Sequence, residues 1–291
     1  MLNKISLGTV QFGLDYGIAN KRGRISDKEI FGILDFAHSK GIKSLDTGYA
    51  YGKSENLIGR YMEDGKNSFK IISKLPAQEK YSSENVEKLF FSSLKRLNKK
   101  KIYGYLLHRF EDFLSHEELW DIFRKLKKSG LVKKIGFSLY RPEELEILFD
   151  RKVDFDIVQI PYNIFDQRFK IYSEALKKRQ VEVYARSVFL QGLFFLKMEE
   201  IEKRFSSATG PMKKLNMISC DSNIPVHSLC LCFVLLSKFI DNAIVGIDSL
   251  AQLKQNLDSL KYMGVAKKNF DLIERTLMFH DEKVILPFNW Q

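Results

Sequence analysis

Short apolar segments alternate with amphipathic segments along the whole chain. The apolar segments are nearly continuous runs, which is typical of strands that are buried on both faces of a parallel sheet. The amphipathic segments between them have the periodicity of helices with one apolar face. The predicted strands are Ile5–Val10, Lys43–Thr47, Phe69–Lys74, Ile102–His108, Lys134–Leu139, Phe155–Tyr162, Val181–Ser187 and Asn242–Ile247.

Local signals mark the ends of the predicted helices. Ser26-Asp27-Lys28-Glu29 has the residues of a capping box and opens a helix that we expect to end at Lys40-Gly41. A shorter helix is predicted near Glu55–Tyr61. The remaining predicted helices are Ser83–Leu97, Glu117–Leu131, Arg141–Phe149, Phe169–Arg179, Val226–Lys238 and Leu250–Tyr262.

This alternation indicates the α/β class. About eight strand–helix units within roughly 260 residues favour a single (β/α)₈ TIM barrel. A doubly wound sheet would need a glycine-rich turn after the first strand, and none is present there. Only Ser206-Ser207-Ala208-Thr209-Gly210-Pro211 has the composition of a loop or linker. We therefore expect one domain over residues 1–291.

Composition narrows the protein class further. The chain is 45% hydrophobic and 29% charged, which is ordinary for a folded soluble protein. No apolar run reaches the roughly 18 residues of a membrane span, and Met1–Ile5 does not resemble a signal peptide. We therefore expect a cytoplasmic protein with no membrane partner. The three cysteines, Cys220, Cys230 and Cys232, are expected to be reduced packing residues rather than a metal site or disulfides.

The net charge of +11 raises the possibility of a nucleic-acid partner. The basic clusters 99–101, 125–128 and 177–179 fall near the ends of separate predicted helices, where they complement helix dipoles and solvate the surface. Neither zinc-finger spacing nor an arginine-rich arm accompanies them. We expect no nucleic-acid partner.

Ionisable residues follow three consecutive predicted strands. The second strand ends at Asp46 and its loop holds Tyr51, the third ends at Lys74, and the fourth ends at His108. Active sites of (β/α)₈ barrels lie at the carboxyl ends of the strands. Each of these residues alone has an ordinary structural explanation, but together at successive strand ends they predict a catalytic site.

The segments around these residues resemble the aldo-keto reductase family. Leu45-Asp46-Thr47-Gly48-Tyr49-Ala50-Tyr51-Gly52 is similar to the family segment D-T-A-x-x-Y-G, with Gly48 in place of the usual Ala. Ile72-Ser73-Lys74 resembles its lysine strand, and Tyr105-Leu106-Leu107-His108 its histidine strand. Leu7-Gly8-Thr9 and Val158-Gln159 resemble the first and sixth strands, so that the likeness runs over essentially the whole chain.

The resemblance implies a catalytic tetrad of Asp46, Tyr51, Lys74 and His108. Hydride transfer to a carbonyl carbon leaves an alkoxide, which Tyr51 can protonate as a general acid. A free phenol, with a pKa near 10, is a poor acid at neutral pH. We expect Lys74 to lower the pKa of Tyr51 and Asp46 to hold Lys74 charged. His108 can donate to the carbonyl oxygen and orient it. No metal is expected.

The family also implies a nicotinamide cofactor, NAD(H) or NADP(H). Ser138 and Gln159 match the carboxamide contacts, but Leu139 stands where Asn is usual. Arg186 stands where an aromatic ring usually stacks on the nicotinamide; a guanidinium can also stack, and Tyr184 lies on the same face two residues earlier. The other positions expected to contact the cofactor are Thr9, Ser187, Phe189, Gln191, Gly246, Asp248 and Asn256.

The sequence after the eighth strand bears on the choice of dinucleotide. Val245–Leu253 contains no basic residue that could meet a 2′-phosphate, and Asp248 is acidic. A carboxylate suits the ribose 2′-hydroxyl of NAD(H) better than it suits the 2′-phosphate of NADP(H). We expect NAD(H) to be slightly favoured, or both to be used, because Lys254 or a loop lysine can also reach the phosphate.

The expected substrate is a small-molecule carbonyl compound that the enzyme reduces to an alcohol. The opening segment 7–17 resembles family members associated with bacterial surface-polysaccharide biosynthesis, which suggests a keto-sugar. A cofactor-binding partner protein with little turnover and a sugar dehydrogenase remain alternatives, and we expect a monomer. Pocket-lining residues are expected among Phe12, Tyr16, Tyr49, Phe110, Tyr140 and Tyr162.

Overall fold

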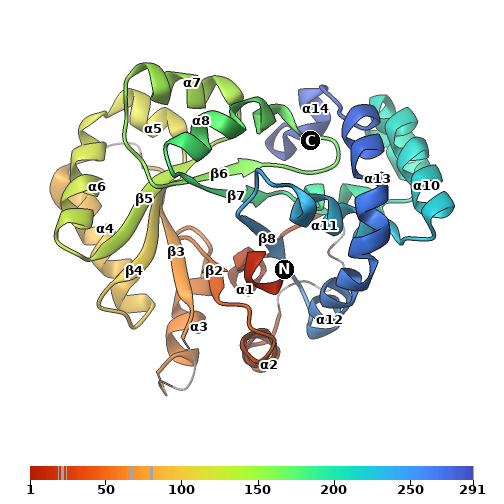
Figure 1. Ribbon diagram of the computed structural model, residues 1–291. Coiled ribbons are helices and arrows are strands. Elements are labelled where there is room, and N and C mark those ends of the chain that lie inside the picture. The colour runs from red at the N-terminus through yellow and green to blue at the C-terminus, as the bar shows by residue number, and fades with distance from the viewer. Residues whose placement is uncertain are drawn as a thin grey trace.

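Eight parallel strands close into a barrel in the computed structural model, which describes residues 1–18, 20, 23, 25–63, 65, 68–78 and 81–290. Each strand pairs with its neighbours in chain order, and β8 closes the ring against β1. Helices surround the strands (Figure 1). The predicted (β/α)₈ barrel is therefore confirmed. The strands are β1 (Ile5–Gly8), β2 (Ser44–Asp46), β3 (Lys70–Leu75), β4 (Ile102–Leu107), β5 (Val132–Ser138), β6 (Ile157–Pro161), β7 (Glu182–Arg186) and β8 (Asn242–Gly246).

Helices and short 3-10 turns connect the strands. The capping box predicted at Ser26 is present, since its side chain accepts a hydrogen bond from the backbone N–H of Glu29. The α-helices are α1 (Val10–Gly13), α2 (Asp27–Ser39), α3 (Ser54–Tyr61), α4 (Ser83–Arg96), α5 (Phe110–Ser115), α6 (Glu118–Lys128), α7 (Pro142–Asp150), α8 (Ser173–Lys178), α9 (Met198–Arg204), α10 (Thr209–Ser222), α11 (Val226–Leu236), α12 (Leu250–Asp258), α13 (Met263–Thr276) and α14 (Glu282–Ile285). The 3-10 turns are η1 (Leu2–Lys4), η2 (Arg168–Tyr172), η3 (Leu190–Phe195), η4 (Ser206–Ala208), η5 (Ser259–Tyr262) and η6 (Pro287–Asn289).

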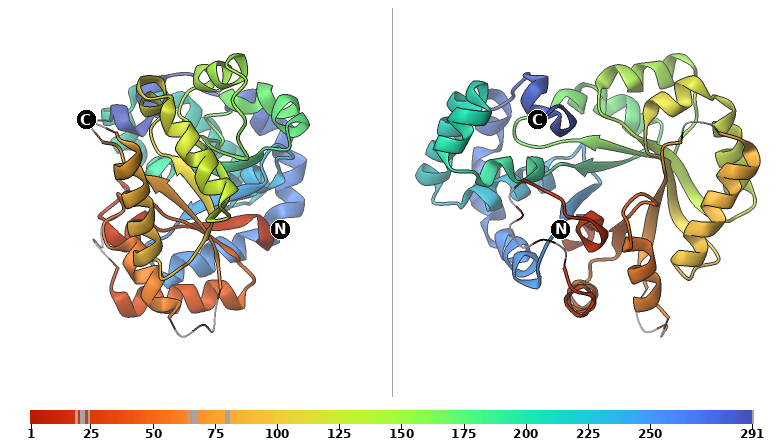
Figure 2. Two further views of the ribbon diagram at one scale, coloured as in Figure 1. Left: turned by 90° about the vertical axis from the view of Figure 1, so that its left-hand side faces the viewer. Right: turned by 180° about the vertical axis from the view of Figure 1, so that it is seen from behind.

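Two predictions about the carboxyl-terminal half are wrong. The segment expected to be a loop, residues 206–211, is η4 followed by the first turn of α10. Pro211 is tolerated there because the first turn of a helix needs no donor from its backbone nitrogens. α9, α10 and α13 were not predicted; α10 and α13 pack against α11 at one side of the barrel (Figure 2).

Two of the three cysteines pack as expected. Cys230 and Cys232 are buried in α11, whereas Cys220 is exposed on α10, so it is not a packing residue. Among the described residues, no single helix has both the length and the apolar composition of a membrane span. Only the bent pair 206–222 and 226–236 meets both criteria when its two helices are counted together.

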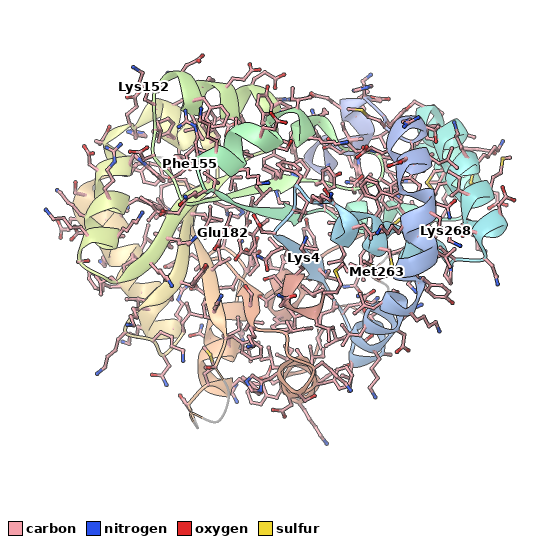
Figure 3. All side chains as sticks on the ribbon, viewed as in Figure 1. Lys4, Lys152, Phe155, Glu182, Met263 and Lys268 are labelled. Carbon is pink, nitrogen blue, oxygen red and sulfur yellow. The ribbon has the colours of Figure 1, made fainter. Side chains whose placement is uncertain are left out.

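The amino-terminal end of the barrel is closed by a polar network. The Tyr103 hydroxyl donates to both carboxylate oxygens of Glu182, at 2.8 and 3.0 Å, and Lys134 Nζ donates to the same group at 2.8 Å. Lys4 Nζ donates to the backbone carbonyl of Ile240 at 2.8 Å. Figure 3 shows Lys4 and Glu182 near the centre of the ring of helices. Tyr103, Lys134 and Glu182 are therefore paired with one another, and Lys4 is paired with the backbone.

Apolar side chains fill the barrel interior above this network. The cluster consists of Ile72, Leu106, Ile157, Tyr184 and Ile244, and it is separate from the larger core between strands and helices. The interior is thus packed, and open space begins only at the carboxyl ends of the strands.

Candidate active site

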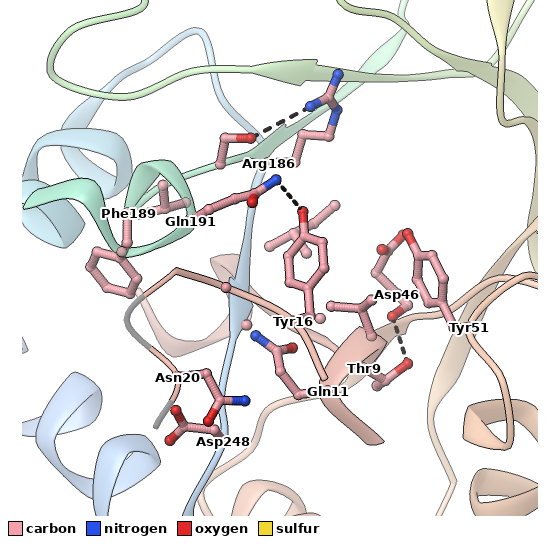
Figure 4. A pocket seen from close by; sticks show the side chains of 18 of the residues that line it. Thr9, Gln11, Tyr16, Asn20, Asp46, Tyr51, Arg186, Phe189, Gln191 and Asp248 are labelled. Atoms are coloured by element: carbon pink, nitrogen blue, oxygen red, sulfur yellow. Dashed lines mark hydrogen bonds between the residues drawn. The ribbon is translucent and has the colours of Figure 1, made fainter. Parts of the chain in front are cut away.

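A cavity of about 570 Å³ opens at the carboxyl ends of the strands. Figure 4 shows Asp46 and Tyr51 at one side of it, Asn20 and Asp248 at the other, and Tyr16 between them. All predicted catalytic and cofactor-contact residues line this cavity: Asp46, Tyr51, Lys74, His108, Thr9, Ser138, Gln159, Arg186, Ser187, Phe189, Gln191, Gly246, Asp248 and Asn256.

Lys74 and Asp46 form a buried ion pair at the base of the cavity. Lys74 Nζ donates to the two carboxylate oxygens of Asp46 at 2.8 and 2.7 Å and to the backbone carbonyl of Thr47 at 2.8 Å. These bonds use all three protons of the ammonium. Gln159 Nε2 also donates to Asp46 Oδ1. The pair is therefore held in one geometry from three strands, β2, β3 and β6.

A chain of hydroxyl groups fixes the loop that carries Tyr51. The Ser54 hydroxyl donates to Thr9 Oγ1 at 2.8 Å, and Thr9 Oγ1 donates to the backbone carbonyl of Asp46 at 2.9 Å. The loop also approaches α1 very closely: a Cβ added at Gly13 would lie 1.9 Å from the carbonyl oxygen of Tyr51. Only glycine permits that approach, so α1 helps to set the height of Tyr51 above the barrel.

Tyr51 stands over the ion pair and beside His108. Lys74 Nζ lies 4.9 Å from the centroid of the Tyr51 ring, and the rings of Tyr51 and His108 are 5.8 Å apart at 74°. Within the described part of the chain, no group hydrogen-bonds the Tyr51 hydroxyl. This hydroxyl is therefore available to a molecule in the cavity.

The expectation that Lys74 lowers the pKa of Tyr51 is wrong for this structure. Burial raises the pKa of Tyr51 well above its usual value, and the negative charge of Asp46 raises it further. The physical reason is that Asp46 accepts two hydrogen bonds from Lys74 and balances its charge. Tyr51 therefore keeps its proton at neutral pH, but the raised pKa makes its phenol a weaker acid than a phenol in water.

His108 is a neutral imidazole in this site. Burial lowers the pKa of His108 to about 3, and the positive charges of Lys74 and Arg186 act in the same direction. A neutral imidazole carries one N–H donor. His108 can therefore donate a hydrogen bond to an oxygen atom in the cavity without bringing a positive charge.

Arg186 lines the cavity, whereas Tyr184 does not. Arg186 Nη2 donates to the backbone carbonyl of Leu139 at 2.6 Å, and its guanidinium carbon lies 3.7 Å from the centroid of the Tyr140 ring. Tyr184 belongs to the apolar cluster inside the barrel. The guanidinium, and not the nearby phenol ring, therefore occupies the site where β7 meets the cavity.

Two hydrogen bonds join residues 16–18 to Gln191, in the segment after β7. Gln191 Nε2 donates to the Tyr16 hydroxyl at 2.7 Å, and the backbone N–H of Ile18 donates to the carbonyl of Gln191 at 3.1 Å. Ser187, Leu190 and Gln191 all have positive φ, so the segment after β7 makes a tight turn toward Tyr16. Figure 4 shows Tyr16 and Gln191 meeting across the cavity.

The far end of the cavity is polar. Asp248 lies there with Asn256, and no lysine or arginine of the described chain lines this end. Lys254 does not reach it, because Lys254 Nζ lies over the Phe36 ring, 5.5 Å from the centroid. Lys21, Arg22 and Arg24 lie outside the described residues.

Comparison with known proteins identifies the family. The aldo/keto reductase family profile matches residues 4–277. The chain belongs to the aldo-keto reductase family. An uncharacterised oxidoreductase of Bacillus subtilis, YqkF, is 23% identical over 89% of this chain and 91% of its own length. D-threo-aldose 1-dehydrogenase of a Pseudomonas species is 22% identical over 84% of this chain and 88% of its own.

Solved structures agree on the fold. The holo form of an aldo-keto reductase from Bacillus halodurans superimposes with a TM-score of 0.75 at 20% identity, covering 96% of this chain and 94% of that one. Membership of the aldo-keto reductase family makes this protein an oxidoreductase of carbonyl compounds, and enzymes of this family use nicotinamide cofactors.

The cavity of this aldo-keto reductase fits a nicotinamide group at the end near Tyr51. Gln159 Oε1 is buried and has no hydrogen-bond partner among the described residues, while its amide nitrogen is held by Asp46. The amide therefore offers a fixed acceptor, which suits the NH₂ of a carboxamide. Ser138, buried at the end of β5, supplies a neighbouring hydroxyl.

Several cavity residues were not predicted. Gln11 lines the cavity with a buried Oε1 that has no partner among the described residues, and its position in α1, two residues after Thr9, was the available signal. Asn20, His227, Gln252 and Gln255 also line the cavity, at positions that no sequence pattern distinguishes.

The predicted substrate-pocket residues are only partly correct. Tyr16 and Tyr140 line the cavity, but Phe12, Phe110 and Tyr162 are buried in the core. Tyr49 is outside the cavity lining as well: the Arg96 guanidinium stacks on its ring at 3.8 Å from the centroid. Aromatic residues that follow strands can point either to the cavity or to the core, and sequence position does not distinguish the two.

Proposed function

We propose that this aldo-keto reductase reduces an aldehyde or ketone to an alcohol, with Tyr51 as the general acid and His108 as the donor that orients the carbonyl oxygen. The observation that carries this proposal is the position of the Tyr51 hydroxyl: no described residue hydrogen-bonds it, and Tyr51 lines the cavity beside the His108 ring and above the buried Lys74–Asp46 ion pair. Positioned proton transfer contributes roughly 10²–10⁴-fold to a rate.

Each residue has a separate task in this proposal. A bound nicotinamide cofactor supplies the hydride. His108 donates its N–H to the carbonyl oxygen, where negative charge develops. Tyr51 transfers its phenolic proton to that oxygen. Lys74, 4.9 Å from the Tyr51 ring centroid, stabilises the tyrosinate that remains, and Asp46 keeps Lys74 in place. Ser138 and Gln159 would hold the carboxamide, and Thr9 and Gly246, which also line the cavity, would contact the rest of the cofactor.

We infer a preference for NADH over NADPH from the far end of the cavity. A 2′-phosphate carries between one and two negative charges and would meet Asp248 without a lysine or arginine of the described chain beside it. One lost charge-assisted contact corresponds to about tenfold in affinity. Fluorescence titration should therefore give a Kd for NADH about tenfold lower than for NADPH, and Asp248→Asn should narrow that ratio. Tighter binding of NADPH to the unaltered protein would contradict the inference.

The proposed substrate is a keto-sugar, because phenol rings with polar tips suit hydroxylated molecules. Tyr16 and Tyr140 present such rings to the cavity. A second candidate is oxidation of a sugar. It is favoured by the relatives, which include D-threo-aldose 1-dehydrogenase and, at 32% identity over 37% of this chain, D-arabinose 1-dehydrogenase of Saccharomyces cerevisiae.

Steady-state turnover in both directions tests these candidates together. The purified protein is given NADH or NADPH with keto-sugars and para-nitrobenzaldehyde, and NAD⁺ or NADP⁺ with aldoses. The proposal expects the highest kcat/KM for a keto-sugar with NADH. A higher kcat/KM for an aldose with NAD⁺ would favour the dehydrogenase. Tight cofactor binding without turnover of any compound would favour a cofactor-binding partner protein.

A further inference from the structure

Lys74 and Arg186, the lysine and the arginine of the described chain that line the cavity, are balanced differently. Lys74 is paired with Asp46 through two hydrogen bonds. Arg186 lines the same cavity, but in the described part of the chain no carboxylate lies within 4.0 Å of its guanidinium. Because Tyr51 and His108 are neutral, the cavity wall at this end carries one uncompensated positive charge.

Contacts on one side of Arg186 hold its side chain in place. Its Nη2 donates to the carbonyl of Leu139 at 2.6 Å, and its Nη1 lies 3.4 Å from the hydroxyl of Ser187. The guanidinium carbon lies 3.7 Å from the centroid of the Tyr140 ring. Its Nε is buried and has no hydrogen-bond partner among the described residues. The guanidinium is therefore preorganised, yet neither its charge nor all its donors are satisfied.

The positive charge of Arg186 affects the pKa values of the neighbouring tetrad residues. Its positive charge contributes to lowering the pKa of His108 and of Lys74 and opposes the rise in the pKa of Tyr51. A carbonyl compound held between Tyr51 and His108 therefore lies within electrostatic reach of Arg186. A planar guanidinium binds carboxylates and phosphates in a forked geometry.

We propose that the substrate of this enzyme carries an anionic group, a carboxylate or a phosphate, and that Arg186 binds this group and so determines specificity. This inference rests on the carbonyl-reducing function proposed above and narrows its substrate class. It also explains why a guanidinium can occupy a position at which no described residue supplies a counter-ion: the substrate supplies that charge.

Matched pairs of aldehydes test this proposal. Glyoxylate, succinic semialdehyde and para-carboxybenzaldehyde are each compared with their methyl esters, and para-formylphenyl phosphate is compared with para-methoxybenzaldehyde, which has no ionisable group. The quantity measured is the ratio of kcat/KM for the anionic compound to that for the neutral one. We expect a ratio of about ten or more for at least one pair, and the preferred pair distinguishes carboxylate from phosphate.

Arg186→Met and Arg186→Lys assign the effect to this residue. In Arg186→Met the ratio should fall to about one, whereas Arg186→Lys should keep an intermediate value because it retains the charge but not the fork. If Arg186 contacts only the cofactor, both members of a pair lose kcat/KM together and the ratio is unchanged. That result, or a ratio near one in the unaltered enzyme, would overturn the proposal.

A binding measurement separates this inference from the proposed function. Calorimetric titration of the protein–NADH complex with para-(hydroxymethyl)benzoate and with the corresponding amide requires no turnover. The proposal expects the benzoate to bind about tenfold more tightly, and Arg186→Met to remove the difference. Neutral aldehydes that are reduced without any anion preference would contradict only the inference. An enzyme that reduces no aldehyde but keeps the anion preference would contradict only the proposed reaction.

Discussion

A carboxylate, a lysine and a tyrosine lie together at both ends of the barrel, but they are connected differently. At the amino-terminal end, Glu182 accepts hydrogen bonds from both the Tyr103 hydroxyl and Lys134. The tyrosine is thus a donor within the network, and burial together with the hydrogen bond to Glu182 raises the pKa of Tyr103. The hydroxyl proton of Tyr103 is therefore used in a hydrogen bond within the protein.

At the carboxyl-terminal end the same three residue types occur, but here the tyrosine is not part of the hydrogen-bond network between the lysine and the carboxylate. Lys74 and Asp46 bind each other, and the hydroxyl of Tyr51 is bonded to neither. Buried, unpartnered polar atoms of Gln11, Gln159 and Arg186 also belong to residues that line the cavity. The same three residue types therefore form a closed network at one end and leave a tyrosine hydroxyl facing a cavity at the other, so residue type alone does not distinguish the two ends.

The largest effect is expected from breaking the buried ion pair. Lys74→Met leaves Asp46 buried and uncompensated, which should lower the free energy of unfolding by about 3–5 kcal/mol and abolish turnover. The double variant Lys74→Met/Asp46→Asn removes both charges and should regain most of the stability without regaining activity. Denaturant unfolding and kcat are measured on both variants. Recovery of turnover in the double variant would mean that the pair is only structural.

A smaller effect on stability is expected from the protonation of His108 at acidic pH. The folded pKa of His108, about 3, lies below its unfolded value near 6.5, so between these values only the unfolded state binds the proton. Stability is therefore lost as the pH falls through this range. When the pH is lowered from about 7 to about 4.5, the free energy of unfolding should fall by about 1–3 kcal/mol less in His108→Gln than in the unaltered protein. His280→Gln, at an exposed position, is the control. Equal acid sensitivity of His108→Gln and the unaltered protein would show that His108 is not held neutral.

The smallest effect is expected at Gly48, where the family usually has Ala. A Cβ there would lie 3.4 Å from Tyr51 Cε1 and 3.6 Å from Lys74 Cβ, which are ordinary contacts. Gly48 does not have a positive φ, so Ala can adopt its conformation. Gly48→Ala should raise the free energy of unfolding by about 0.4–1 kcal/mol and change kcat little. A strong loss of kcat would mean that the space beside the Tyr51 ring is needed for the reaction.

The barrel, and the grouping of Asp46, Tyr51, Lys74 and His108 at one end of it, could be predicted from the sequence because both depend on local patterns. Continuous apolar runs indicate buried parallel strands, and Asp46, Lys74 and His108 lie at or next to the ends of such runs. The register of the strands then brings these residues together. No knowledge of the loops is needed for that step.

Features that depend on tertiary contacts could not be predicted. The pKa of Tyr51 depends on burial and on how completely Asp46 balances Lys74, and neither follows from spacing. The sequence similarly does not determine where an aromatic side chain that follows a strand will point. Tyr140, which follows β5, lines the cavity, whereas Phe110, which follows β4, is buried in the core. The helices α10 and α13 were missed because they lie outside the strand–helix repeat.

The most direct test of the comparison between the two ends removes one hydroxyl from each. Tyr51→Phe should lower kcat for carbonyl reduction by about 10²–10⁴-fold while the Kd for NADH and the free energy of unfolding stay nearly unchanged. Tyr103→Phe, which loses its hydrogen bonds to Glu182, should lower the free energy of unfolding by about 1–2 kcal/mol and leave kcat unchanged. Substantial turnover by Tyr51→Phe, under conditions in which it binds NADH normally, would contradict the assignment of Tyr51 as the acid.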